Sequence, residues 1–258
     1  MAWTRRGDRN GKRKSSLLGR AYPNKRKWLS FNQSMRQMNQ SLDARQYAPA
    51  TQRNREPILE VLLQVLPPTG TVLEVSSGTG EHAVFLAPRL HPRQWIPSDP
   101  NPVARASIAA WREHCPADNL YPPIALDACD SVWGIEQNEP PEGLQDIDLK
   151  RDPIVAIVNI NMIHIAPWSA CLGLMAGARR ILPPGGILYL YGPFKQGGKH
   201  TAPSNADFDE SLRAQNPEWG VRDLNDVVAV AQAQHLSLVK TYAMPANNLS
   251  VIFQAQIS

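Results

Sequence analysis

The sequence contains few cysteines and no short metal-binding motif. Three cysteines, Cys115, Cys129 and Cys171, lie far apart in 258 residues and show no C-x-x-C spacing. Disulfide scaffolds and structural zinc sites need closely spaced cysteines or histidines, so the pattern argues against both classes. No H-E-x-x-H segment is present. We therefore expect reduced thiols, as in the cytoplasm, and no metal cofactor.

Long apolar runs are also missing from the sequence. No stretch of eighteen apolar residues occurs, which argues against a membrane-spanning helix. The first residues are charged and lack the apolar segment of a secretory signal. These absences predict a cytoplasmic protein with no membrane partner. An apolar content of 43% is still enough for a substantial core in one domain.

Positive charge is concentrated at the beginning of the chain. Residues 1–36 contain eleven Lys and Arg and one acidic residue, whereas residues 37–258 contain 16 basic and 22 acidic residues. Segment 1–40 shows no apolar period, which predicts a basic disordered tail before a domain at 41–258. Interleaved aromatic residues allow a second interpretation, an arm that binds RNA. We favour an inert extension.

Short buried-strand patterns alternate with helical patterns along residues 41–258. This alternation predicts an α/β fold with a mostly parallel, doubly wound sheet. The last two strand patterns, 236–242 and 249–253, are joined by a loop too short for a parallel crossover. They predict a C-terminal antiparallel hairpin, which is typical of the Rossmann-like sandwich of class I methyltransferases. The other expected strands are 71–75, 94–97, 122–126, 154–158 and 187–191, and the expected helices are 57–66, 81–90, 102–114, 169–182 and 227–234.

Two segments fit neither pattern. Residues 130–152 are rich in acids and contain Pro140 and Pro141, which predicts an irregular insertion outside the core. Residues 192–226 are long and polar, and we expect only short helical pieces there. Long loops in compact domains are usually functional, so this second segment is predicted to form an ordered wall of the active cleft.

The segment from Val72 to Ala83 reads as a buried strand, a glycine turn and the start of a helix. It fits the dinucleotide pattern G-x-G-x-x-A, and it also fits the S-adenosylmethionine pattern E-x-G-x-G-x-G with Ser76 at the first glycine position. Glu74 ends the strand, and Gly78 and Gly80 fill the last two glycine positions. A carboxylate suits a cationic ligand better than a pyrophosphate. The pattern favours S-adenosylmethionine over NAD(P).

Polar residues follow the other predicted strands. In a doubly wound sheet the ligand lies at the carboxyl ends of the strands. Asp99 follows the second predicted strand, where it can accept from ribose hydroxyls or cap the next helix. Asp127 follows the third, where it can accept from the adenine amino group or face solvent. Asn159 and His164 interrupt an apolar run where the cleft should open. We expect Asn159 to contact the cofactor.

Several segments together resemble a family of small proteins of unknown function, the methyltransferase-like protein twenty-six family. The resemblance covers about Leu42 to the C-terminus. It implies a class I fold and S-adenosylmethionine binding, with Tyr47 and Asn54 as cofactor contacts, and it implies no particular substrate. The segments are 45–54, the glycine turn, 97–99, 159–168, 191–194, His200-Thr201, Ser204-Asn205, Trp219-Gly220, 222–224 and 244–249.

The predicted function is methyl transfer to a small molecule. Alignment does most of the work in such a reaction, and a base is needed only if the acceptor must lose a proton. His164 and Asp209 are the candidate bases. The alternatives are a non-catalytic cofactor-binding protein, an RNA methyltransferase that uses the tail, and an NAD(P)-linked enzyme. The expected substrate contacts are Asn161, Trp168, Phe194, His200 and Asn205.

Overall fold

The computed structural model describes residues 43–137, 139 and 141–256. The predicted tail at 1–40 lies outside these residues. A compact unit extends over Ala44–Ser258. Within the described residues, no helix combines the length and apolar character needed to cross a bilayer.

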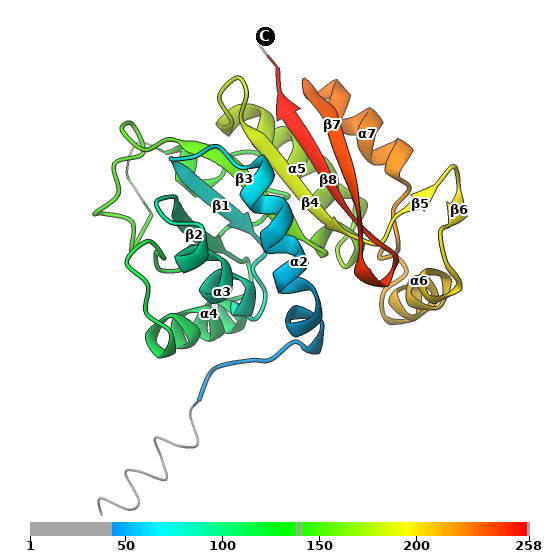
Figure 1. Ribbon diagram of the computed structural model, residues 1–258, viewed down its shortest axis with the longest axis horizontal. Helices are drawn as coiled ribbons and strands as arrows, with labels where there is room; N and C mark the ends of the chain where they lie inside the picture. The colour runs from blue at the N-terminus through cyan, green and yellow to red at the C-terminus, as the bar shows by residue number, and fades with distance from the viewer. Residues whose placement is uncertain (1–42, 138, 140, 257–258) are drawn as a thin grey trace, which may run out of the picture. The chain divides into compact units, whose positions relative to one another are not determined.

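Six strands of the described chain form one mixed sheet in the order β2-β1-β3-β4-β8-β7. The first four strands pair in parallel, and β8 runs antiparallel to both β4 and β7. Figure 1 shows this sheet at the centre of the compact unit. The mostly parallel sheet and the C-terminal hairpin are both confirmed. The strands are β1 (Thr71–Val75), β2 (Gln94–Ser98), β3 (Ile154–Ile160), β4 (Ile187–Gly192), β7 (Leu236–Met244) and β8 (Asn248–Ala255).

Helices cover both faces of the sheet (Figure 1). On one face, α2 (Pro49–Val65) and α3 (Glu81–Arg89) pack their apolar side chains against Val72 and Trp95. On the other face, apolar side chains of α5 (Trp168–Ile181) and α7 (Leu224–Ala233) belong to one core cluster with Leu73. Neighbouring residues of a strand point to opposite faces, so a strand covered on both sides is apolar at most positions. This explains the continuous apolar runs in the sequence.

The first helix begins earlier than predicted. The sequence predicts a start at Pro57, but α2 starts at Pro49 and contains Pro57 in its interior. The apolar period begins only at Ile58, because the buried side chains of the first two turns are Thr51 and Asn54. Hydrophobic periodicity could not reveal turns whose inward face is polar.

The predicted strand at 122–126 is absent. Parallel β-bridges at Leu120 and Ile124 are the contacts of this segment with β2. Pro122 and Pro123 lie between them, and proline has no N–H for a continuous ladder. Residues 130–152 are irregular as expected, apart from the short helix η1 (Gly134–Glu136). Their exclusion from the core was wrong, because three of their side chains are buried in it: Trp133, Ile135 and Leu144.

The segment 192–226 is more regular than predicted. It contains the small hairpin of β5 (Lys195–Gln196) and β6 (Lys199–His200), followed by the 13-residue helix α6 (Pro203–Gln215). The buried side chains of α6 are Asn205, Asp209 and Leu212. Their spacing is helical, but two of the three are polar, so the apolar pattern of a helix is missing from the sequence.

Candidate functional site

The candidate site lies at the carboxyl ends of the parallel strands. The chain passes from β1 to β2 on one side of the sheet, whereas β3 and β4 lie on the other side of β1. The order therefore reverses between β1 and β3. Ligands of open α/β sheets bind at such a switch point, and the glycine turn follows β1 directly at this point.

The two glycines of the turn have different structural roles. Gly78 has φ +59°, and a Cβ added to it would meet no atom within 4 Å. Gly80 has φ +87°, and its Cβ would lie 2.8 Å from the Cα of Ile108 in α4 (Pro102–His114). Both glycines adopt left-handed conformations that L side chains rarely take. Gly78 faces open space, whereas Gly80 allows α4 to pack against the turn.

Asp99, just after β2, is bonded to the glycine turn. One of its carboxylate oxygens accepts from the backbone N–H of Gly78 at 3.0 Å, and the other accepts from Asn101 N–H at 2.9 Å. The side chain of Asn101 caps α4 by accepting from Val103 N–H. Asp99 itself is 6% exposed. The helix cap that we considered for Asp99 belongs to Asn101, and the ribose contact of Asp99 stays a prediction.

Glu74 points to the face of the sheet that α2 and α3 cover. The residue is 2% exposed, and its carboxyl group accepts from the indole N–H of Trp95 at 2.9 Å. Burial raises its pKa to about 7, against the opposing effect of the hydrogen bond from Trp95. Glu74 was predicted as a cofactor contact, and the structure gives its carboxyl a partner inside the protein.

Asn159, near the end of β3, bridges the switch point. Its side-chain N–H donates to the carbonyl of Val75 at 2.9 Å. Its Oδ1 atom is buried and has no hydrogen-bond partner among the described residues. A buried acceptor without a donor is costly, so this oxygen is suited to accept from a ligand. Asp127 is exposed, and its carboxylate accepts from Cys129 N–H.

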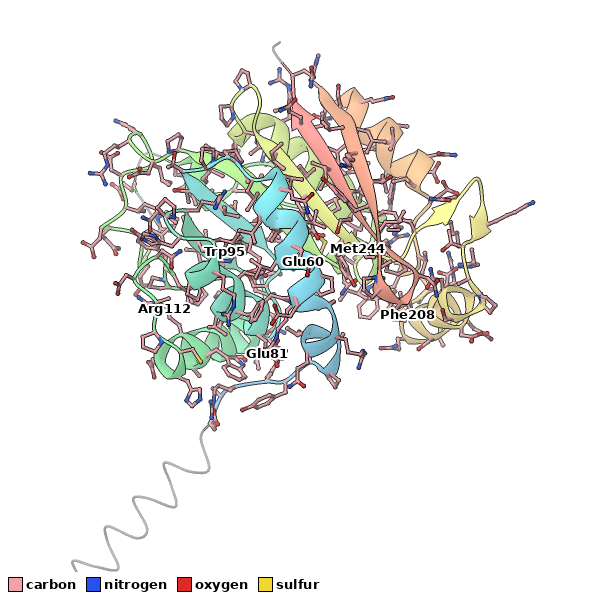
Figure 2. All side chains as sticks on the ribbon, in the orientation of Figure 1. Glu60, Glu81, Trp95, Arg112, Phe208 and Met244 are labelled. Carbon is pink, nitrogen blue, oxygen red and sulfur yellow. The ribbon has the colours of Figure 1, made fainter. Side chains whose placement is uncertain are left out.

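The segment before α2 lies against the glycine turn and α4. Gln46 N–H donates to the hydroxyl of Ser107 at 2.8 Å, and that hydroxyl donates to the carbonyl of Thr79 at 2.7 Å. Ala48 N–H donates to Glu81 at the start of α3, which Figure 2 labels. Tyr47 packs edge-on against Trp111 of α4, with ring centroids 5.1 Å apart. Segment 45–48 thus covers the side of the turn, and sequence reasoning missed Ser107 and Glu81.

A cavity of about 580 Å³ lies at the carboxyl ends of β3 and β4. Three of the predicted site residues, Asn54, Asn161 and Asn205, line it. Asn54 also accepts from His82 at 2.9 Å when His82 carries its proton on Nε2. Phe208 of α6, labelled in Figure 2, forms part of the wall. The remaining lining residues are Ala50, Arg53, Ile165, Tyr191, Pro193, Ser204, Ala246 and Asn248.

Four other predicted residues lie outside this cavity. His164 and Phe194 are fully buried and pack edge to face, with ring centroids 4.9 Å apart. Trp168 lines a separate cavity of about 890 Å³ beside α7. His200 lies on β6, where its ring contacts Asp209. Phe194 is 0% exposed, so its side chain has no surface on this cavity.

His164 is poorly placed to act as a base. Its Nδ1 atom accepts from Arg222 N–H at 3.2 Å, so the neutral ring carries its proton on Nε2. Burial, aided by the nearby Arg222 charge, lowers the pKa of His164 to about 3. A Cβ on Gly192 would lie 2.5 Å from Nε2, so the ring fills space beside the end of β4.

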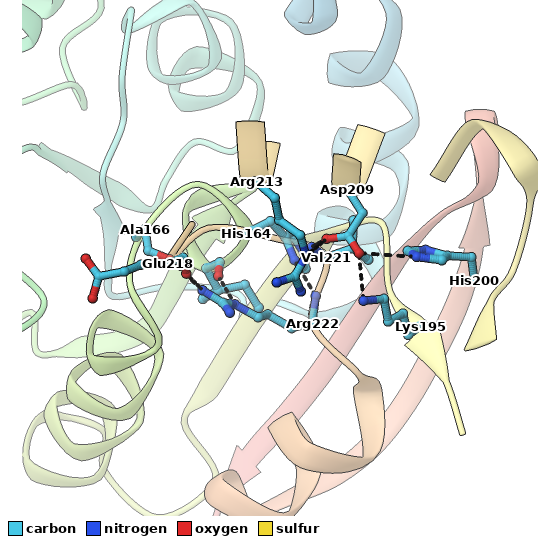
Figure 3. A network of polar contacts seen from close by, with 10 residues as sticks. His164, Ala166, Lys195, His200, Asp209, Arg213, Glu218, Val221 and Arg222 are labelled. Carbon is cyan, nitrogen blue, oxygen red and sulfur yellow. Dashed lines mark hydrogen bonds and ion pairs between the residues drawn. The ribbon is translucent and has the colours of Figure 1, made fainter. Parts of the chain in front are cut away.

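Asp209 is the centre of a polar network that joins α6 to the small hairpin (Figure 3). Its carboxylate contacts Lys195 at 2.7 Å, His200 at 3.2 Å and Arg213 at 3.2 Å. It also accepts from Val221 N–H at 2.7 Å. Burial raises the pKa of Asp209, but the Lys195 and Val221 hydrogen bonds and the nearby cations outweigh burial and lower it overall. These partners make Asp209 a weak base and a structural anchor.

Arg222 completes the same network from the other side (Figure 3). Its guanidinium donates to the carbonyls of Ile163, Ala166 and Glu218. It thereby ties the loop after β3 to the loop before α7. Within the described residues, no cluster of His, Cys, Asp or Glu side chains is arranged to hold a metal ion.

Comparison with known proteins places the chain in a family. Residues 45–255 match the family described as "Protein of unknown function (DUF938)". The chain belongs to this family. The description assigns no activity to the family, and the match begins close to the point where the described residues begin.

The fold is also similar to solved methyltransferase structures. An O-methyltransferase family protein from Burkholderia thailandensis is 14% identical, with a TM-score of 0.60 over 78% of this chain and 56% of that chain. An O-methyltransferase family 2 protein from Planctomyces limnophilus, in complex with apigenin, is 18% identical, with a TM-score of 0.60 over 88% and 60% of the two chains.

Human N-acetylserotonin methyltransferase in complex with SAM is 10% identical, with a TM-score of 0.58 over 79% of this chain and 55% of that chain. The chain spans less than two thirds of the length of these three proteins. At such identities the similarity shows the fold alone. It establishes the Rossmann-like class I methyltransferase fold.

Proposed function

We propose that the protein is an S-adenosylmethionine-dependent methyltransferase that acts on a small molecule. The open side of Gly78 at the switch point, beside the carboxylate of Asp99, carries this proposal. The space that a Cβ would fill at Gly78 is empty, so a ligand can approach the backbone closely. The resemblance to the methyltransferase-like protein twenty-six family agrees with this function.

The residues at the switch point fit the cofactor. Asp99 would accept from the ribose hydroxyls of the cofactor. The buried Oδ1 of Asn159 would accept from the amino group of its methionine part. Asp127 and the turn after it would lie beside the adenine. When bound, the cofactor supplies a methyl group already activated on a sulfonium. The buried carboxyl of Glu74 would not touch the cofactor. It holds β1 and β2 together beneath the site by accepting from the indole N–H of Trp95.

The protein's own part is to hold and shield the reactants. Segment 45–48, fixed to the glycine turn through Ser107, would cover the methionine end of the cofactor, with Tyr47 at the edge. The neighbouring cavity of about 580 Å³ has the size of a small-molecule site. Positioning two reactants in this way supplies much of the catalysis for a step that needs little covalent help.

Three alternatives make different demands on the chain. An NAD(P)-linked enzyme is favoured only by the G-x-G-x-x-A pattern at 78–83, and the antiparallel β7–β8 hairpin does not belong to the dinucleotide fold. An RNA methyltransferase would depend on the tail at 1–40, outside the described residues. A non-catalytic binding protein would hold the cofactor without turnover.

Calorimetry with S-adenosylhomocysteine, NAD and NADP separates the proposed function from an NAD(P)-linked enzyme. We expect binding of S-adenosylhomocysteine alone. Binding of NAD or NADP with no response to S-adenosylhomocysteine would reject the proposal. Comparison of RNA binding by the full chain and by a chain starting at Met38, at low and physiological salt, tests the tail. We expect neither protein to bind RNA at physiological salt and both to retain cofactor affinity.

A further inference from the structure

We infer that the methyl acceptor is a small carboxylic acid, which enters the 580 Å³ cavity as its anion and is methylated on the carboxylate. This inference rests on the proposed function and names the substrate class of that site. It depends on two properties of the cavity, its charge and its lack of a base.

The charge of the cavity wall is positive. Arg53 on α2 is the one charged side chain among the twelve described lining residues, and none of the twelve carries a carboxylate. Arg53 is exposed and has no carboxylate partner among the residues that the structure describes. A guanidinium binds a carboxylate through two parallel hydrogen bonds or through one. An anionic acceptor would therefore supply the counter-charge that Arg53 lacks.

The described part of the wall also lacks a general base. Besides Arg53, its titratable side chain is Tyr191 at the end of β4. Burial raises the pKa of Tyr191, although hydrogen bonds with Asn54 and Asn248 oppose this effect. Its hydroxyl therefore stays protonated near neutral pH. His164 and Asp209 do not line the cavity, and both are engaged with other parts of the protein.

With no base in the described wall, an acceptor that has to lose a proton must lose it before it binds. A carboxylic acid meets this condition, because it has lost its proton well below neutral pH. One carboxylate oxygen can face Arg53 while the other attacks. In this step an oxygen–carbon bond forms, the carbon–sulfur bond of the sulfonium breaks, and its electron pair stays on sulfur. No proton moves, and the anion and the sulfonium become a neutral ester and a neutral thioether.

The rest of the wall suits an apolar body with one polar group. Ile165 and Phe208 are partly exposed and flank the cavity beside Pro193. Asn161 lines it from a left-handed turn, φ +66°, at the end of β3. The side chain of Asn161 makes no hydrogen bond to a described residue, whereas the amide of Asn205 already donates to Thr201 and Asn247. Asn161 is thus an amide available to the acceptor.

The first measurement tests the role of Arg53 without turnover. Arg53→Gln is compared with Arg151→Gln, which removes the same charge from a side chain that is 77% exposed and paired only with Asp152. Affinity for S-adenosylhomocysteine is measured for wild type and both variants. We expect all three values to agree within about twofold. A tenfold loss in Arg53→Gln alone would assign Arg53 to the carboxylate of the cofactor and overturn the inference.

The second measurement looks for the acceptor by its charge. A small-metabolite extract is divided by anion exchange into an anionic and a non-anionic pool. Each pool is dialysed against the S-adenosylhomocysteine complex, and the retained molecules are identified by mass. We expect retention from the anionic pool by wild type and Arg151→Gln, and a loss of roughly tenfold or more in Arg53→Gln, as for a charged hydrogen bond.

Turnover with methyl-labelled cofactor completes the test. A methyl ester releases its label as methanol in mild alkali, whereas an ether, a thioether or a methylamine keeps it. We expect alkali-labile label from the anionic pool. Label that resists alkali, label from the non-anionic pool, or no label from the anionic pool would overturn the inference. Failure to bind S-adenosylhomocysteine would instead overturn the proposed function, so the two failures are distinct.

Discussion

The carboxylate of Asp99 accepts from the backbone N–H of Gly78 at 3.0 Å, so the end of β2 fixes the turn that follows β1. The two residues are 21 positions apart in sequence and meet because β1 and β2 are parallel neighbours. The same carboxylate also accepts from Asn101 N–H, just before α4. One side chain thus orders both loops beside the proposed cofactor, and removing it should affect the fold as well as binding.

Asp99→Ala should lower the free energy of unfolding without ligand by roughly 1–3 kcal/mol, because two backbone N–H groups lose their acceptor. It should also weaken S-adenosylhomocysteine binding, since the turn would be less ordered and a ribose partner would be lost. Denaturant unfolding and calorimetry give the two values. Asp99→Asn, which keeps one acceptor oxygen, should be intermediate in both. A stable, normally folded Asp99→Ala protein with normal affinity would contradict this role.

Gly78 and Gly80 should respond differently to substitution. Gly78→Asn keeps a residue that tolerates a left-handed φ and places a side chain in the open space beside the turn. Its melting temperature should fall only slightly, while S-adenosylhomocysteine binding is lost. Gly80→Ala should lose stability with or without ligand, because its Cβ would lie 2.8 Å from the Cα of Ile108.

The comparison of these two glycine variants is decisive for the position of the ligand. Both introduce a side chain at a positive φ within one turn, but asparagine tolerates this conformation better than alanine, so affinity and not stability carries the comparison. Normal affinity in a folded Gly78→Asn protein would move the ligand away from this side of the turn.

Glu74 should make stability depend on pH. Its pKa is about 7 in the folded protein and about 4.5 in the unfolded chain, because burial disfavours the carboxylate. Its contribution to stability is therefore complete below pH 4.5 and is lost as the pH rises through 7. Ionisation at pH 8 costs on the order of 3 kcal/mol. Glu74→Gln, which avoids this cost, should be more stable than wild type at pH 8.

The advantage of Glu74→Gln should shrink on acidification, and at pH 5 the two proteins should be of similar stability. Chemical denaturation at pH 5, 6.5 and 8 measures the difference. A constant difference over this range would show that Glu74 titrates alike in the folded and unfolded states. Trp95 fluorescence in the folded state would report the same ionisation, since its indole N–H donates to this carboxyl.

The sequence predicts the sheet well because its strands are covered on both faces. Buried parallel strands are mostly apolar, so β1, β3 and β4 stand out from the polar residues around them. The β7–β8 connection is too short for a parallel crossover, so these two strands can pair only in the antiparallel direction. The positions of the glycine turn and of Asp99, directly after β1 and β2, could be predicted from the spacing of the strands.

Elements with polar inward faces could not be predicted in this way. The first two turns of α2 bury Thr51 and Asn54, and α6 buries Asn205 and Asp209. Their stability depends on partners far away in sequence, such as His82 for Asn54. The same limitation explains the prediction of His164 as a base, because only the folded protein brings Arg222 N–H to its ring.

Asp209→Asn provides the clearest separation of a structural from a catalytic role. The amide can still accept from Val221 N–H, but the negative charge between Lys195, His200 and Arg213 is lost. We expect a stability loss of roughly 1–3 kcal/mol, as for charged hydrogen bonds at a mostly buried site. Backbone amides of β5, β6 and α6 should exchange with deuterium faster, whereas S-adenosylhomocysteine affinity should stay within about twofold.

Asp207→Asn is the matched control, since it removes the same charge from the exposed side of α6. It should alter neither exchange nor affinity. If Asp209 were instead the base, Asp209→Asn would abolish methyl transfer while the exchange of the hairpin and α6 remained unchanged.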